Sequence, residues 1–133
     1  MSINCGIALR SGETFQTIYC HWDGYPSYML PMLRENYNSL ELAAKLISYG
    51  DASSIDKKLE PTPGVAHTFI MPEKDVCIFY HRDRGEDWIS CESACYTKQE
   101  LFRQQAFDYV YIFEDETWNC YKNGRKLDYD KTR

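Results

Sequence analysis

The pattern of apolar and polar positions predicts a β-hairpin at the start of the chain. Residues 5–10 alternate well enough for a strand, and residues 15–21 form a second run rich in β-branched and aromatic side chains. Ser11, Gly12 and Glu13 lie between the two runs and are typical of a turn. Neither set of alternating positions in the second run is cleanly polar, so we expect both faces of the hairpin to be largely covered.

Two consecutive helices are expected after this hairpin. The first spans about residues 27–37, because Pro31 is tolerated in a first helical turn, where its missing N–H has no partner anyway. Ser39 is a good N-cap for a second helix over 40–49, in which apolar residues recur four positions apart. Gly50 is the glycine expected just past the end of that helix.

The middle of the chain is expected to be less regular. Residues 51–64 combine serines, lysines and the sequence Pro-Thr-Pro-Gly, which favours a loop. Short strands are expected at 66–71 and 76–80, separated by a tight turn at 72–75. Residues 81–87 are strongly charged and are expected to form a second loop.

The last third of the chain predicts a short helix followed by a meander. Thr97 and Glu100 have the spacing of a capping box and open a helix that ends near residue 105. The remaining strands are expected at 109–113, at 118–122 across an acidic turn, and at 125–127 after the Asn123-Gly124 turn.

Together these elements predict an α+β fold in one domain that spans residues 1–133. The expected sheet is antiparallel, with an N-terminal hairpin and a C-terminal meander, and it is joined by a consecutive helix pair and a short third helix. At 133 residues the chain is long enough to bury a core without metals or disulfides. Its contents of 44% hydrophobic and 26% charged residues are ordinary for a globular protein.

The formal net charge of −5 argues against sequence-independent binding to DNA, which needs clustered lysines and arginines. Some of the acidic residues are clustered, notably Glu114, Asp115 and Glu116. Such a face can speed the encounter with a basic partner. The alternative interpretation is a plain solvated acidic surface.

Six cysteines do not by themselves indicate disulfides. The N-terminus lacks a basic stretch followed by an apolar run, so we expect no secretory signal and a cytoplasmic, reducing setting with free thiols. No window approaches the roughly 18 apolar residues of a membrane span. Cys91 and Cys95 have no second pair of matching spacing, so neither a zinc site nor any other cofactor is expected.

Four chemically capable residues gather where the hairpin ends, namely His21, Trp22, Asp23 and Tyr25. Alternation in a strand points His21 and Asp23 the same way, and a His beside a carboxylate is the minimal general-base pair. No nucleophile or oxyanion donor is evident nearby. In the structural alternative Trp22 fills the core, Asp23 caps the turn and His21 binds a backbone group.

A second group follows the expected strand at 76–80 and comprises His81, Arg82, Asp83 and Arg84. Two arginines in one loop can clamp a phosphate or a carboxylate. They can equally pair within the chain, with Asp83 and Glu86.

The two groups predict a shared pocket if both strands end at the same edge of the sheet. Trp22, Tyr25, Arg82 and Arg84 would then line it. Such a pocket would suit a small nucleotide, because its base would stack on the aromatic side chains and its phosphates would bind the arginines.

The sequence also carries a longer pattern. The stretch Ile-Tyr-Cys-His-Trp-Asp-Gly-Tyr-Pro-Ser at 18–27, Gly-Asp-Ala-Ser-Ser-Ile at 50–55 and Asp-Arg-Gly-Glu at 83–86 resemble a family of small bacteriophage and prophage proteins. The resemblance covers mainly the first 55 residues. It implies little about activity in itself. Small acidic phage proteins of this kind often antagonise host defence, by binding CRISPR effectors or by sequestering nucleotide signals.

The sequence is therefore compatible with three functions. The first is a phage-encoded, anti-CRISPR-like inhibitor that acts in the host cytoplasm by non-enzymatic binding to a defence protein or nucleoprotein. The second is a nucleotide-binding sponge that uses the aromatic and arginine pocket. The third is a small hydrolase, with or without a metal, that uses His21, Asp23, His81 and Asp83.

Overall fold

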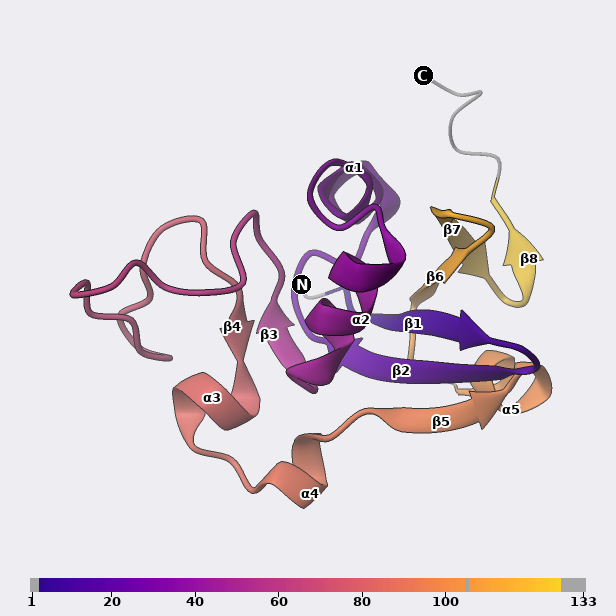
Figure 1. Cartoon of the computed structure of the whole chain (residues 1–133). Helices are drawn as coiled ribbons and strands as arrows, with labels where there is room; N and C mark the ends of the chain where they lie inside the picture. The colour runs from indigo at the N-terminus through magenta and orange to yellow at the C-terminus, as the bar shows by residue number, and fades with distance from the viewer. Residues whose placement is uncertain (1–2, 105, 128–133) are drawn as a thin grey trace.

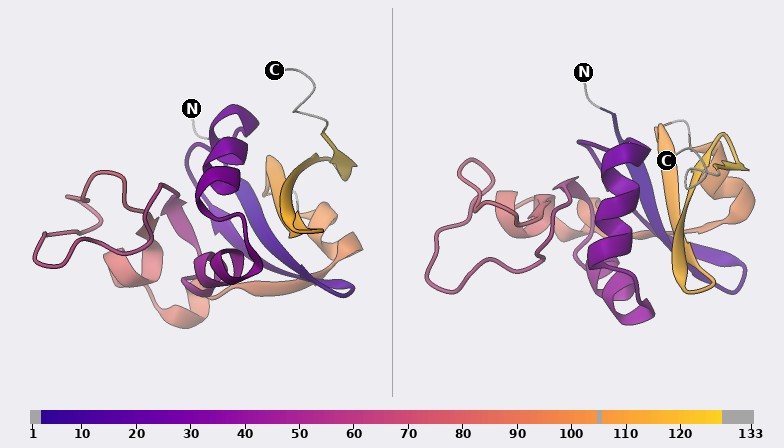
Figure 2. Two further views of the ribbon diagram at one scale, coloured as in Figure 1. Left: turned by 45° about the horizontal axis from the view of Figure 1, so that its top comes forward. Right: turned by 90° about the horizontal axis from the view of Figure 1, so that it is seen from above.

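A computed structural model describes residues 3–104 and 106–127, and strands in this part of the chain form one twisted mixed sheet with helices on both faces (Figures 1 and 2). The order of strands along the sheet is β4-β3-β2-β1-β6-β7-β8, and β5 pairs with β2 off this path. The strands are β1 (Cys5–Ser11), β2 (Thr14–Cys20), β3 (Ala52–Ser54), β4 (Ile78–Phe79), β5 (Ala94–Thr97), β6 (Tyr109–Glu114), β7 (Thr117–Lys122) and β8 (Arg125–Lys126). The helices are α1 (Pro26–Asn36), α2 (Leu40–Ser48), α3 (Tyr80–Arg84), α4 (Trp88–Cys91) and α5 (Lys98–Arg103).

The predicted α+β class and the mostly antiparallel sheet are confirmed. The N-terminal hairpin pairs Cys5 with Cys20, and β6 and β7 pair in antiparallel fashion, as do β7 and β8. Two parallel pairs, β1 with β6 and β2 with β3, were not expected. Both join strands that are distant in the sequence, and no local turn signal announces such a pairing.

The helix pair is also confirmed, with one correction. Ser39 caps α2 by accepting a hydrogen bond from the Leu42 N–H at 3.1 Å. In α1, however, Pro26 occupies the first turn and Pro31 lies further inside the helix. The prediction that Pro31 lies in the first turn is therefore wrong, because Pro26 occupies that turn and sets the start of the helix.

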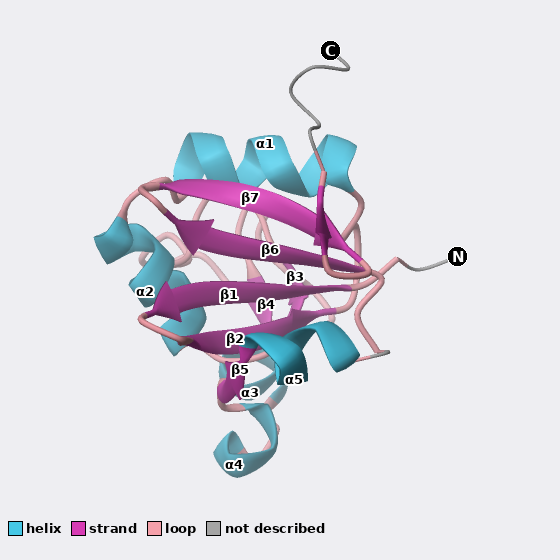
Figure 3. Cartoon of the chain, turned by 90° about the vertical axis from the view of Figure 1, so that its right-hand side faces the viewer, coloured by secondary structure: helices cyan, strands magenta, loops and turns pink. Residues whose placement is uncertain are grey.

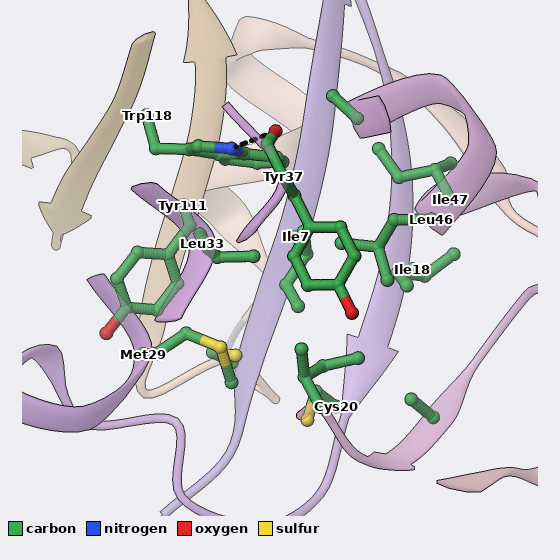
Figure 4. Close-up of a cluster of buried hydrophobic side chains, with 14 of the residues drawn as sticks. Ile7, Ile18, Cys20, Met29, Leu33, Tyr37, Leu46, Ile47, Tyr111 and Trp118 are labelled. Atoms are coloured by element: carbon green, nitrogen blue, oxygen red, sulfur yellow. Dashed lines mark hydrogen bonds between the residues drawn. The ribbon is translucent and has the colours of Figure 1, made fainter. Parts of the chain in front are cut away.

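Helices α1 and α2 cover one face of the sheet, where the larger core lies (Figures 3 and 4). Trp118 and Tyr37 are 0% and 2% exposed, and the Trp118 indole donates a hydrogen bond to the Tyr37 carbonyl at 2.9 Å. Leu33 of α1 and Leu46 of α2 pack into the same cluster against Ile18 of β2. The amphipathic helices thus bury their apolar faces against the sheet.

The opposite face carries α5 and a smaller apolar cluster (Figure 3). The predicted capping box is present, since Thr97 and Glu100 each accept a hydrogen bond from the backbone N–H of the other. The helix ends at Arg103, and residue 105, where its end was predicted, lies outside the described residues. The cluster beneath it consists of Ala8, Phe15, Leu101, Val110 and Ile112.

The middle of the chain differs most from its prediction. The expected loop at 51–64 contains β3, and the expected strand at 76–80 shrinks to β4. The expected strand at 66–71 is not a strand, because the Phe69 N–H donates to the Asp83 carbonyl on α3 rather than to a neighbouring strand. The expected loop at 81–87 contains most of α3, which ends at Arg84 and is capped by Gly85 with φ +79°.

No helix in residues 3–104 and 106–127 combines the length and the apolar character needed to cross a bilayer.

Candidate functional site

His21 lies just past β2, and its imidazole pairs with Tyr19. The His21 N–H donates to the Ala52 carbonyl at 3.1 Å, so the residue prolongs the parallel ladder with β3. His21 Nδ1 lies 2.7 Å from the Tyr19 hydroxyl, and its ring meets Trp22 edge-on with 4.7 Å between ring centroids. Among the described residues His21 has no hydrogen bond or ion pair with Asp23, so the expected general-base pair does not form, and Tyr19 is the partner of the imidazole instead.

The turn that follows is fixed by close backbone packing. Asp23 has φ +58°, and the Gly24 N–H donates to the Ile3 carbonyl at 2.8 Å. A Cβ on Gly24 would lie 2.6 Å from the backbone carbon of Asn4, so only glycine fits here. The Tyr111 hydroxyl donates to the Gly24 carbonyl at 2.6 Å and ties the turn to the core.

The aromatic residues of this turn face solvent. Trp22 is 46% exposed and Tyr25 is 36% exposed. The interpretation that Trp22 fills the core is therefore wrong. Both side chains are available to a partner on a turn that the core holds in place.

Arg82 of α3 is used inside the molecule. Its Nε donates to Asp83 Oδ1 at 2.9 Å, and its terminal nitrogens donate to the carbonyl oxygens of Leu59 at 2.5 Å and Cys77 at 2.9 Å. The guanidinium also lies over the rings of Tyr49 and Phe79. This is the internal pairing left open by the sequence, and it fastens the chain between β3 and β4 to α3.

Asp83 and His67 form a buried pair beside Arg82, with 4% and 2% of their side chains exposed. His67 Nδ1 accepts the Glu73 N–H at 2.9 Å, so the imidazole proton is on Nε2, which lies 3.3 Å from Asp83 Oδ2. Burial tends to raise the pKa of Asp83, but hydrogen bonds from Arg82 and the Phe79 N–H, together with the charge of Arg82, outweigh it and lower that pKa. His67 lay in the predicted strand at 66–71 and carried no signal of this role.

Arg84 and His81 lie on the exposed side of α3. Arg84 Nε contacts Glu86 at 3.2 Å, and its guanidinium lies 4.9 Å from the centroid of the Phe69 ring. His81 Nδ1 lies 2.8 Å from the Glu86 carbonyl, and its ring lies 5.1 Å from that of Trp88. The pairing of Arg84 with Glu86 is again the internal alternative.

The condition for a shared nucleotide pocket is not met. Since β2 is parallel to β3 and β3 is antiparallel to β4, the chain leaves β2 and β4 in opposite directions. His21 and His81 therefore do not follow strand ends at one edge of the sheet. Burial first, and then the charge of Tyr80, raise the pKa of Tyr19.

The acidic turn between β6 and β7 divides into two parts. Asp115 and Glu116 are exposed and have φ of +51° and +65°, which suits the tight twist of a hairpin. The Glu114 side chain is only 10% exposed and contacts Arg10 Nη1 at 3.3 Å. It also accepts hydrogen bonds from Asn119 and the Tyr121 hydroxyl, so it is not part of a free acidic face.

The structure adds an exposed feature that sequence reasoning missed, which we name the α4 surface. It consists of Glu86, Asp87, Trp88, Ile89 and Glu92, all of which are exposed. Trp88 is 38% and Ile89 is 79% exposed. The signal in the sequence was the apolar pair Trp88 and Ile89, which lies between the acidic residues Asp87 and Glu92.

The α4 surface is seated firmly on the end of α2. Gly50 has φ +82°, and a Cβ there would lie 2.5 Å from the Cys91 carbonyl oxygen and 3.0 Å from the Trp88 ring. The Asp51 N–H donates to the same carbonyl at 2.7 Å. Gly50 therefore both ends α2 and admits α4, which presents Ile89 outward from a rigid base.

The cysteines give no metal centre in the part of the chain that the structure describes. All six are free, and only Cys95 is exposed. No three His, Cys, Asp or Glu side chains among the described residues gather in a way that could hold a metal ion.

No protein-family model, curated protein or solved structure matches this chain. The resemblance to bacteriophage proteins therefore stays a prediction from the sequence.

Proposed function

We propose that this protein is a phage-encoded inhibitor that acts in the host cytoplasm by binding a defence protein or nucleoprotein, and that the α4 surface makes the contact. The observation that carries the proposal is the pair Trp88 and Ile89, exposed together in an acidic surround. Aromatic and large aliphatic side chains in the middle of a polar rim are typical of the residues that dominate interface energies.

The charges around this pair favour a basic target. Asp87 and Glu92 form no ion pair with any described residue, so their charges are free to meet a partner. A nucleoprotein that binds nucleic acid has basic surfaces of the required sign. With a net charge of −5 on the whole chain, attraction speeds the encounter and buried apolar contacts hold the complex.

The seating of α4 supports tight binding as well. Because Cys91, Trp88 and Gly50 are packed together, little conformational freedom is lost when a partner covers Ile89.

A binding role is better supported than the hydrolase hypothesis. His21 pairs with Tyr19, His81 with a backbone carbonyl, and Asp83 with internal donors. These are structural contacts, and they do not prepare a water or a nucleophile for attack.

The test is inhibition of DNA cleavage by a panel of purified CRISPR effector complexes. Wild-type protein is expected to inhibit at least one complex, and Ile89→Asp to raise the concentration needed by about tenfold or more, the effect of losing one hot-spot residue. Leu40→Asp is the matched control, because Leu40 is 65% exposed at the other end of α2. It is expected to inhibit like the wild type.

Two results would count against the proposal. Failure to inhibit any complex would reject the anti-CRISPR role, and equal inhibition by Ile89→Asp and the wild type would place the interface elsewhere. As a further check, Asp87→Lys is expected to slow association more at low salt than at high salt.

A further inference from the structure

A pocket of about 530 Å³ lies on the α5 face of the sheet, and no residue of the α4 surface lines it. Its floor includes Phe15 of β2 and Ile112 of β6, which are 4% and 2% exposed. Phe102 of α5 and Tyr121 of β7 also line it, with 5.3 Å between their ring centroids. The volume falls within the range of about 300–1,000 Å³ that small-molecule sites occupy.

The rim of this pocket holds a positioned guanidinium. Arg10 Nε donates to the Gly12 carbonyl at 3.0 Å and Nη1 donates to Glu114 at 3.3 Å. Nη2 has no partner among the described residues, and the side chain is 48% exposed. Two contacts therefore fix the plane of the guanidinium, and its remaining edge is free for an acceptor.

Glu114 positions Arg10 and does not offer a cation site. One carboxylate oxygen contacts Arg10, and the other accepts hydrogen bonds from Asn119 and Tyr121. Burial and the hydrogen bond to Glu114 raise the pKa of Tyr121, so its hydroxyl stays protonated and donates. The acceptors of this buried carboxylate are thus used by the protein itself.

The charges of the pocket then favour a ligand with a single negative charge. Glu114 offsets Arg10, and Lys98 forms no ion pair with the described residues. Glu13, which also lines the pocket, and Lys98 are both exposed, so water and salt screen the charge of each. One lysine charge and one free guanidinium edge suit one anionic group better than a polyphosphate.

We propose that this pocket binds a small ligand made of one planar ring system and one anionic group. The ring lies against Phe102 and Tyr121, and the anion meets Arg10 and Lys98. Cyclic mononucleotides and aromatic carboxylates share this chemistry. The site is separate from the α4 surface and does not depend on the proposed inhibition of host defence.

Isothermal titration calorimetry tests the proposal with two ligand pairs. One arm compares 3′,5′-cyclic AMP with neutral adenosine, and the other compares indole-3-acetate with neutral indole-3-acetamide. We expect saturable binding of the anion in one arm, and binding of its neutral analogue that is about threefold or more weaker, the size of an exposed charge contact. The arm that responds identifies the source of the ring.

Variants locate the site. Lys98→Glu is expected to weaken binding about threefold to tenfold, because attraction becomes repulsion at the rim. It leaves α5 folded, since an acidic residue is favourable in a first helical turn. Lys57→Glu makes the same change at an exposed lysine outside the pocket and is expected to bind like the wild type. Gln99→Trp is expected to obstruct the opening and abolish binding.

Three results would overturn the proposal. They are no binding of either anion at about 5 mM, equal binding of an anion and its neutral analogue, and equal loss in Lys98→Glu and Lys57→Glu. Ile89→Asp is expected to bind the ligand like the wild type, so this proposal and the proposed inhibitory function fail independently.

Discussion

The sheet beneath α1 and α2 and the outer loop, residues 56–77 between β3 and β4, are held in place by different forces. The sheet is held by buried side chains such as Trp118, Ile7 and Ile18, which are at most 1% exposed. The outer loop extends away from the sheet (Figures 1 and 2), and it exposes 88% of Ile70 and 74% of Met71. Leu59 and Cys77 anchor it in the core, and the rest of the loop is attached by hydrogen bonds that converge on a few charged residues.

The contrast between the two regions shows where stability depends on single groups. Apolar burial is spread over many contacts and does not change with protonation. In the outer loop, the Arg82 guanidinium donates hydrogen bonds to two separate backbone carbonyls. The Glu73 carboxylate accepts hydrogen bonds from Thr62 and Lys58. Hydrogen bonds from the Thr62 hydroxyl and N–H, and then from Lys58, lower the pKa of Glu73 to about 2. Such hubs make the outer loop sensitive to one substitution or to acid.

Substitutions in the core of the sheet are expected to cost the most stability. Trp118→Ala is expected to lower the free energy of unfolding by about 3–5 kcal/mol, because it empties a large core volume and leaves the Tyr37 carbonyl without its donor. Trp118→Phe keeps most of the ring and is expected to cost about 1–2 kcal/mol. Urea unfolding followed by circular dichroism measures both. A loss below about 1 kcal/mol in Trp118→Ala would show that this core is not the main source of stability.

In the outer loop the decisive comparison is between two arginines of α3. Arg82→Ala is expected to cost about 2–3 kcal/mol, since it leaves the Asp83 carboxylate, only 4% exposed, without its guanidinium. Arg84→Ala removes an ion pair whose side chains are 53% and 42% exposed and is expected to cost at most about 0.5 kcal/mol. Hydrogen exchange at the amides of Lys58 and Cys77 is expected to accelerate only in Arg82→Ala. Equal acceleration in both variants would reject the assignment of Arg82 as the hub.

The parts of the fold that could be predicted are those set by local patterns. The alternation of apolar and polar residues predicted the N-terminal hairpin. Ser39 and Gly50 predicted where α2 begins and ends, and the spacing of Thr97 and Glu100 predicted the start of α5. The parallel pairing of β1 with β6 could not be read, because it joins residues about a hundred positions apart without a turn between them. The apolar run at 66–71 was misread as a strand, since its pattern does not reveal that no strand lies beside it.

The candidate sites divide in the same way. The sequence drew attention to His21, Arg82 and Glu114 because of their residue types, yet each has an internal partner. The α4 surface and the α5 pocket depend on which side chains the fold leaves uncovered. Lys98 and Phe15 meet at the pocket only because β5 returns to pair with β2. Residue type indicates what a group can do, but only packing decides which groups remain free to do it.

Acid is expected to change stability least, and its effect separates the outer loop from the sheet. The folded-state pKa of Asp83 is lowered, so between that pKa and the ordinary value of about 3.9 the unfolded chain binds more protons. The stabilisation from Asp83 is therefore complete above about pH 4 and is lost as the pH falls through the folded-state pKa. Asp83→Asn lacks this dependence, so its free energy of unfolding is expected to fall less than that of the wild type between about pH 5 and pH 2. Urea midpoints across this range measure the difference, with Asp87→Asn on exposed α4 as the matched control. Parallel curves for the wild type and Asp83→Asn would mean that the charge of Asp83 does not hold the outer loop, which would then depend on apolar contacts as the sheet does.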